Sequence, residues 1–162
     1  MARLAENVYL TWKPETIKSL VSRLKREGKK IVFTNGVFDI LHFGHVDYLE
    51  KAGNLGDILI VGLNRDSSVK KFKSKNRPVQ PERDRARILA ALRMVDYVIL
   101  FSEETPERLI KLIEPDILVK GADYKISQIV GADFVKSYGG RVRRIPLRKG
   151  RSTTEIIKRL KT

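Results

Sequence analysis

The sequence contains no cysteine and only two histidines, His42 and His45. The absence of cysteine excludes a disulfide scaffold, a cysteine-ligated zinc site and a cysteine nucleophile. Two histidines are too few for a multi-histidine metal site, and no metal ligand is assigned from the protein's own residues. No apolar run reaches the length of about eighteen residues that a transmembrane helix needs, and no secretory signal is recognised at the start. We therefore expect a cytoplasmic protein with no membrane partner.

What the chain does have is an ordinary apolar content and a large excess of positive charge. Its 162 residues are 42% hydrophobic and 32% charged, which fits one globular domain and excludes a collagen-like or typical disordered chain. The 33 Lys and Arg residues outnumber 19 acidic residues, so the net charge is +14. Such a field attracts phosphates of any kind, and composition alone does not decide between an RNA-binding module and a nucleotide enzyme.

Short apolar strands alternate with helical patterns along the chain. We expect an N-terminal arm over 1–13 and a single domain over 14–162, with a first helix from Pro14 to Gly28. Thr105 is expected to cap a later helix that has Pro106 in its first position. The alternation predicts an α/β, Rossmann-like, doubly wound parallel sheet of five strands with helices on both faces, and ligands beyond the carboxyl ends of the strands. The expected strands are 31–34, 57–63, 96–101, 116–120 and 141–145; the other expected helices are 43–52, 81–93, 126–138 and 153–160, with a short helix and a loop in 65–80.

The segment after the first strand carries the chemistry. It runs from Thr34 to His45 with the sequence TNGVFDILHFGH. Gly36 allows a close backbone approach or a positive φ, and Gly44 leaves space above the free N–H groups at the start of the next helix, which bind anions. His42 and His45 are three residues apart, so both lie on one side of the first helical turn and can donate to one phosphate oxyanion. The alternative is a pair of helix-cap histidines with no catalytic role.

The stretch from Gly36 to His45 resembles the GxFDxxHxGH signature of the cytidylyltransferase-like nucleotidyltransferases. Near the C-terminus, Ser152-Thr153-Thr154 resembles the second signature of that family, although a plain N-cap would explain the same residues. With Arg77-Pro78-Val79 and the segment 116–124, the chain is most similar to the adenylyltransferase domain of ADP-heptose synthesis. The resemblance covers nearly the whole chain, from residue 16 to residue 160.

This resemblance implies a reaction and a set of site residues. The family joins a nucleoside triphosphate to a phosphorylated small molecule and releases pyrophosphate. The implied substrates are ATP and the sugar 1-phosphate D-glycero-β-D-manno-heptose 1-phosphate, and the product is a lipopolysaccharide inner-core precursor. Mg²⁺ is expected with ATP, held largely by substrate phosphates. The implied catalytic residues are His42, His45 and Lys73; the nucleotide-binding residues are Asn35, Gly36, Val37, Phe38, Gly44, His45, Arg85, Lys120, Gly121, Ser152, Thr153 and Thr154; the substrate-binding residues are Asp39, which could instead shape the turn, Asn64, Asp66, Lys71 and Asp123.

Two other functions stay open at this point. A different enzyme of the same family would pair CTP with glycerol 3-phosphate, or ATP with FMN, although Val37 replaces the Thr of the cytidylyltransferase sequence GTFD. A basic RNA-binding module would use residues 136–162, but aromatic residues make up only 7% of the chain and form no RNP-like pattern; we expect no specific nucleic-acid partner. Larger members of the family carry a preceding sugar-kinase domain, so we expect a single-activity enzyme or one excised domain. A homodimer is compatible with the family likeness alone.

Overall fold

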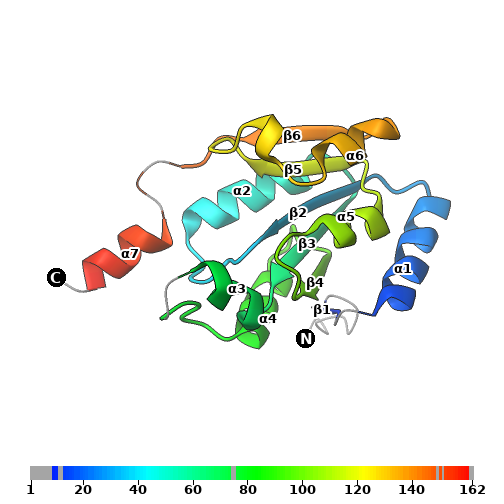
Figure 1. Ribbon diagram of the computed structural model, residues 1–162. Helices are drawn as coiled ribbons and strands as arrows, with labels where there is room; N and C mark the ends of the chain where they lie inside the picture. The colour runs from blue at the N-terminus through cyan, green and yellow to red at the C-terminus, as the bar shows by residue number, and fades with distance from the viewer. Residues whose placement is uncertain (1–8, 11–12, 74–75, 149, 151, 161–162) are drawn as a thin grey trace.

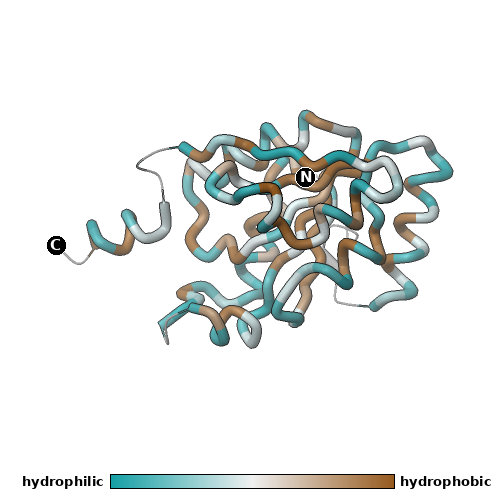
Figure 2. The backbone as a smooth tube through the Cα atoms, turned by 45° about the horizontal axis from the view of Figure 1, so that its top comes forward, coloured by the Kyte–Doolittle hydropathy of each residue, from teal (hydrophilic) through white to brown (hydrophobic). Residues whose placement is uncertain are grey.

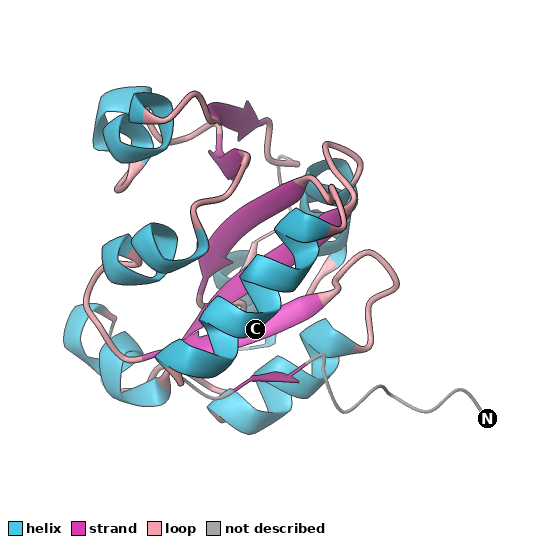
Figure 3. Ribbon diagram, turned by 90° about the vertical axis from the view of Figure 1, so that its right-hand side faces the viewer, coloured by secondary structure: helices cyan, strands magenta, loops and turns pink. Residues whose placement is uncertain are grey.

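The computed structural model describes residues 9–10, 13–73, 76–148, 150 and 152–160. Six strands form one sheet in the order β1-β4-β3-β2-β5-β6, and every neighbouring pair is parallel. The strand order reverses beside β2, because β3 and β4 follow on one side and β5 and β6 on the other. The strands lie at the centre of the molecule with the helices around them (Figure 3). The strands are β1 Tyr9–Leu10, β2 Ile31–Gly36, β3 Ile58–Asn64, β4 Tyr97–Phe101, β5 Ile117–Gly121 and β6 Arg141–Ile145.

Helices cover both faces of the sheet, which makes three layers (Figure 1). Buried side chains of α1, α5 and α6 pack on one face, and those of α2 and α4 pack on the other. The core therefore lies in two apolar clusters, one on each side of the strands. The helices are α1 Pro14–Arg26, α2 Phe43–Gly53, α3 Asp66–Phe72, α4 Glu82–Ala90, α5 Glu107–Ile113, the 3₁₀ turn η1 Ile126–Gln128, α6 Ala132–Ser137 and α7 Thr153–Leu160.

The sequence patterns explain these elements. In α1 the buried residues are Ile17, Leu20, Val21 and Leu24, spaced three and four apart as one helix face requires. In β3 all residues after the first are buried, because helices cover both faces and no alternation of polar residues is needed. The doubly wound parallel sheet and its five expected strands are confirmed.

The N-terminal arm departs from the expectation. Residues 9–10 form β1, which pairs with β4 and adds a sixth strand at the edge of the sheet. The register joins Tyr9 to Val98 and Leu10 to Ile99. A strand of two residues carries too little periodicity to be recognised in a sequence, since the alternation rule needs at least about four residues.

Three helix boundaries also differ from the prediction. Thr105 is not the cap of α5, because the helix begins at Glu107 and Pro106 occupies the N-cap position. The helix expected over 126–138 is divided into η1 and α6 at Gly131, which has φ +83°. A Cβ on that glycine would lie 2.7 Å from the Ile110 side chain, so the tight approach of α5 requires glycine there. The helix expected over 81–93 ends at Ala90.

The last helix, α7, stands apart from the layers. None of its residues is buried, and it lies beside the body at the far end from α1 (Figures 1 and 2). A hydrogen bond connects the start of α7 to the rest of the protein: the Thr153 hydroxyl donates to the carbonyl of Ile40 at 3.4 Å. The start of α7 is therefore placed next to the turn that follows β2.

Candidate active site

A cavity of about 460 Å³ opens at the carboxyl ends of β2 and β5. These are neighbouring strands at the point where strand order reverses, which is the usual ligand site of open parallel sheets. The position agrees with the sequence expectation. Residues from four parts of the chain line it: the β2–α2 turn with the first half of α2, the end of α3 with the following loop, the ends of β3, β4, β5 and β6, and the start of α7.

The β2–α2 turn is packed tightly around Gly36. A Cβ at this glycine would lie 3.0 Å from the ring of Phe38, so the missing side chain lets the ring fold back over the backbone without a tight contact. Phe38 itself has φ +46° and is buried. Its ring meets the His45 ring edge-on, with centroids 5.2 Å apart. The role of Gly36 is thus the close approach, and not the positive φ.

His42 and His45 stack on each other at the start of α2. Their ring centroids are 3.9 Å apart and the ring planes differ by 22°. Both Nδ1 atoms are buried with no hydrogen-bond partner among the described residues. Burial lowers the pKa of His45 to about 4, helped by His42 and opposed by a contact with the Ile40 backbone. Burial also lowers the pKa of His42, so both rings are neutral at pH 7 and each carries one N–H donor.

The backbone of α2 adds further donors beside the two rings. His42 is the N-cap residue, and its carbonyl accepts the N–H groups of His45 at 2.9 Å and Val46 at 3.2 Å. The first N–H groups of any helix lack an intrahelical acceptor, and here they belong to Phe43 and Gly44. Gly44 lines the cavity. This corner therefore has neutral imidazoles, free amides and the positive end of the helix dipole, a combination suited to anions.

The serine and threonines at the start of α7 face the same cavity. Ser152, Thr153 and Thr154 all line it. The Ser152 hydroxyl also accepts the N–H of Glu155 at 3.2 Å, as an N-cap does. The two interpretations of this segment are compatible, because a capping hydroxyl at the cavity wall can cap the helix and face a ligand.

Lys73 and Lys120 bring positive charge to opposite sides of the cavity. Lys73 is exposed at the end of α3 and lines the opening. Lys120, at the end of β5, donates from Nζ to the carbonyl of Asn35 at 3.0 Å. Burial lowers the pKa of Lys120 to about 8, and nearby Asp123 opposes the shift. The amine is therefore largely charged at pH 7 and holds the ends of β2 and β5 together.

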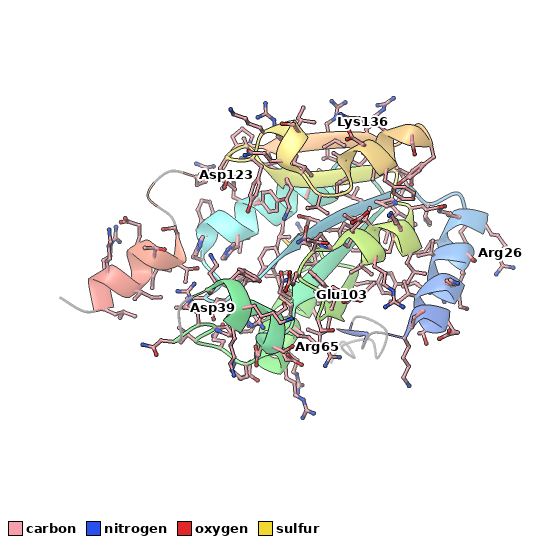
Figure 4. The ribbon with its side chains drawn as sticks, viewed as in Figure 1. Arg26, Asp39, Arg65, Glu103, Asp123 and Lys136 are labelled. Carbon is pink, nitrogen blue, oxygen red and sulfur yellow. The ribbon has the colours of Figure 1, made fainter. Side chains whose placement is uncertain are left out.

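Most of the expected site residues line this cavity, on one wall or another. Asn64 lies at the end of β3 and its amide donates to the Ser68 hydroxyl at 3.2 Å. Asp39 lies on the α3 side and Asp123 on the β5 side, separated across the opening (Figure 4). The expected residues that the cavity contains are Asn35, Gly36, Val37, Phe38, Asp39, His42, Gly44, His45, Asn64, Lys73, Lys120, Gly121, Asp123, Ser152, Thr153 and Thr154.

Three expected site residues, Arg85, Asp66 and Lys71, lie outside the lining of this cavity. Arg85 is fully buried behind the cavity, and its guanidinium donates to the carbonyls of Gln80, Val37 and Asn64 and to the Asp66 carboxylate. These bonds engage its donors within the protein, so Arg85 braces the site, and its expected phosphate contact stays a prediction. Asp66 is occupied by the same pair. The amine of Lys71 lies 3.8 Å from Glu104, outside the cavity lining.

Sequence reasoning missed several cavity residues. Glu104 follows β4, and Leu147 and Arg148 follow β6, so the strand-end rule applied to every strand would have found all three. Arg77 stands in a segment already noted for its family likeness, so considering each side chain of that segment would have found it. Tyr124 follows β5 and lies in the segment 116–124, so the strand-end rule would have found it as well. Tyr48 and Phe72 carry no comparable signal, because their patterns are those of ordinary helix residues. All seven line the cavity.

Among the described residues, no group of three or more His, Cys, Asp or Glu side chains is arranged to hold a metal ion.

Within the same described part of the chain, no helix is both long enough and apolar enough to cross a membrane.

Comparison with known proteins gives relatives for nearly the whole chain. A family model described as cytidylyltransferase-like matches residues 33–159. The bifunctional protein HldE of Syntrophotalea carbinolica is 53% identical over 146 residues, which are 90% of this chain and 30% of that protein. HldE of Campylobacter jejuni subsp. doylei is 56% identical over 144 residues, 89% of this chain and 30% of that protein. The chain thus spans about 30% of the length of these curated relatives.

One solved structure is similar over almost its full length. It is the lipopolysaccharide core biosynthesis protein from Thermoplasma volcanium GSS1, with a TM-score of 0.61 and 32% sequence identity. The alignment covers 75% of this chain and 98% of that one.

Proposed function

Because the chain belongs to the cytidylyltransferase-like family, we propose that it transfers AMP from ATP to D-glycero-β-D-manno-heptose 1-phosphate. The products are ADP-heptose and pyrophosphate. The similarity to the HldE proteins and to a lipopolysaccharide core biosynthesis protein supports a heptose acceptor. The observation that carries the proposal is the stacked, neutral pair His42 and His45 beside the free N–H groups of α2, inside the main cavity.

The proposed reaction needs little covalent help from the protein. An oxygen of the sugar phosphate attacks the α-phosphorus of ATP, and a new P–O bond forms as the bond to pyrophosphate breaks. The attacking oxygen is already ionised at neutral pH, so no general base is required. The obstacle is the meeting of several negative groups, and catalysis consists of positioning and electrostatic stabilisation.

Each group of cavity residues has a part in positioning or electrostatic stabilisation that depends on where it lies. His42 and His45 donate to the α- and β-phosphates, where charge builds up in the transition state. The amides of Phe43 and Gly44 add donors on the same side. Ser152, Thr153 and Thr154 complete the triphosphate side from α7, and Lys73 and Lys120 supply positive charge from opposite walls.

We propose that ATP binds together with Mg²⁺. The ion shields triphosphate charge and is held largely by phosphate oxygens and water, so it needs few protein ligands. This requirement fits the donor set of the cavity, which offers the dispersed carboxylates Asp39, Glu104 and Asp123 and no cluster among the described residues.

The test is a panel of nucleoside triphosphates against phosphorylated acceptors, read as pyrophosphate release. We expect ATP with heptose 1-phosphate to be the best pair. His45→Asn should lower kcat by about 10²–10³, the usual effect of removing one transition-state donor. Arg83→Gln is the matched control, because Arg83 is exposed on α4 and outside the cavity. Preference for CTP with glycerol 3-phosphate or ATP with FMN would replace the proposed acceptor, and no release with any pair would refute a transferase.

A further inference from the structure

Arg77 is a cavity cation whose part in the reaction is still unassigned. It lies in the loop between α3 and α4, and its side chain is only 17% exposed. Its Nε lies 2.8 Å from Oδ2 of Asp39, whose side chain is 1% exposed. The loop thus brings a guanidinium into the cavity, against a carboxylate from the β2–α2 turn that also supplies His42 and His45.

The carboxylate of Asp39 is itself fixed by the loop that carries Arg77. Its Oδ1 accepts the backbone N–H groups of Val79 at 2.8 Å and Gln80 at 2.9 Å. Arg85 holds the same loop from behind through the carbonyl of Gln80 at 3.0 Å. The two ends of the Asp39 carboxylate therefore have different roles: Oδ1 anchors the loop, and Oδ2 faces the guanidinium.

The contact between Arg77 and Asp39 leaves hydrogen-bonding capacity unused. Although Nε and Oδ2 lie at ion-pair distance, they are not aligned as a hydrogen bond, and both are buried without such a partner among the described residues. Within the same part of the chain, the terminal nitrogens of Arg77 make no hydrogen bond, and the guanidinium's ion pair is the one with Asp39. A guanidinium has five N–H donors in a planar fork that matches two phosphate oxygens. A largely buried guanidinium with free terminal donors, inside a cavity with other anion-binding groups, is suited to a phosphate.

We propose that Arg77 is a catalytic residue that binds a phosphate oxyanion in the transfer reaction, and that Asp39 is the positioning residue that holds its guanidinium. This proposal rests on the proposed function. The oxyanion belongs either to ATP or to the phosphorylated acceptor, which share the same chemistry. Asp39, which Arg77 contacts, lies on the α3 side of the cavity, across from Asp123 on the β5 side (Figure 4).

Three substitutions separate charge, fork geometry and positioning. Arg77→Gln removes the charge, and Arg77→Lys keeps it but loses the planar fork. Asp39→Asn keeps an oxygen that can accept from Val79 and Gln80 but places an amide where Oδ2 faced Arg77. Arg83→Gln changes the charge by the same amount at an exposed position and serves as the control.

We expect Arg77→Gln to lower kcat/KM by about 10²–10³ and Arg77→Lys by about 10–10². Asp39→Asn should lower kcat/KM by about tenfold. The double variant Asp39→Asn, Arg77→Gln should have the same kcat/KM as Arg77→Gln alone, because Asp39 acts through Arg77. Thermal unfolding of each variant, compared with Arg83→Gln, separates these effects from loss of fold. A rise in KM for ATP alone identifies ATP as the phosphate source, and a rise in KM for the acceptor alone identifies the acceptor.

The proposal is overturned if Arg77→Gln matches Arg83→Gln in both KM values, in kcat, and in calorimetric titrations with ATP and with heptose 1-phosphate. It is also overturned if the effects of Asp39→Asn and Arg77→Gln are fully additive, since Asp39 would then act independently. An inactive wild-type enzyme would refute heptose transfer but not this assignment. In that case the titrations decide: weaker binding of either ligand by Arg77→Gln supports it, and unchanged binding of both refutes it.

Discussion

At the scale of single residues, the two histidines show how burial selects a protonation state. A charged imidazolium would make a stronger donor, but two adjacent cations in a partly buried corner would repel each other. Burial and the neighbouring ring together lower the pKa of His45 to about 4. Burial also lowers the pKa of His42, so the neutral form of both rings is favoured at pH 7.

This pKa predicts a pH dependence of stability. Below about pH 6.5 the unfolded chain protonates His45, whereas the folded protein resists protonation until about pH 4. The contribution of His45 to the free energy of unfolding is therefore constant above pH 6.5 and falls as the pH decreases toward 4, by up to about 3 kcal/mol. Urea unfolding of the wild type and of His45→Asn should diverge in this window, with the wild type losing more stability. Parallel curves would contradict the lowered pKa.

At the scale of elements, Arg85 connects β2, β3, α3 and α4. Its guanidinium lies at the ends of both strands and pairs with Asp66 at the start of α3. Arg85→Met should lower the free energy of unfolding by about 3–5 kcal/mol, because the partner carboxylate and carbonyls lose their donors. Chemical denaturation measures the effect, with Arg83→Met as the control on the same helix. An unchanged stability combined with weaker ATP binding would support the expected phosphate contact of Arg85.

The start of α7 gives a second test at this scale. Ser152→Ala removes both the cap and the cavity hydroxyl, and Ser152→Gly removes the hydroxyl but costs the cap only a few tenths of a kcal/mol, against about 1 kcal/mol for alanine. If the hydroxyl binds phosphate, both variants raise KM for ATP. If it only caps, Ser152→Ala alone increases amide hydrogen exchange in α7 and Ser152→Gly behaves as the wild type. Steady-state kinetics and exchange by mass spectrometry distinguish the two.

These elements also show what the sequence could and could not predict. Buried strands such as β3 predicted the parallel sheet, because a short continuous apolar run is typical of a strand that helices cover on both faces. The site position followed from strand ends and from the spacing of His42 and His45. The burial of Arg85 behind the cavity was not predictable, because Arg77 and Arg85 are both basic residues near one loop and only three-dimensional packing decides which of them faces the cavity. The break at Gly131 depends on the approach of Ile110 from another helix, a contact that local patterns do not contain.

At the scale of the whole molecule, the net charge of +14 acts on every phosphate ligand. The positive charge attracts ATP over a distance that depends on the salt concentration, since the Debye length falls from about 30 Å at 0.01 M to about 3 Å at 1 M ionic strength. We expect the Kd for ATP to rise by about tenfold or more over this range, while the far-ultraviolet circular dichroism spectrum is unchanged. Calorimetry at several KCl concentrations measures it. A salt-independent Kd would mean that only short contacts inside the cavity matter.

Residues between Asn35 and Tyr48 supply part of the cavity lining, and Leu147, Arg148 and residues 152–154 supply another part. All six strands end at or before Ile145, so every strand precedes Ser152 and Thr153 in the chain. A product truncated just after Ile145 would keep every strand of the sheet and lose the cavity hydroxyls of Ser152 and Thr153. The scaffold and this part of the cavity lining are therefore separable by truncation.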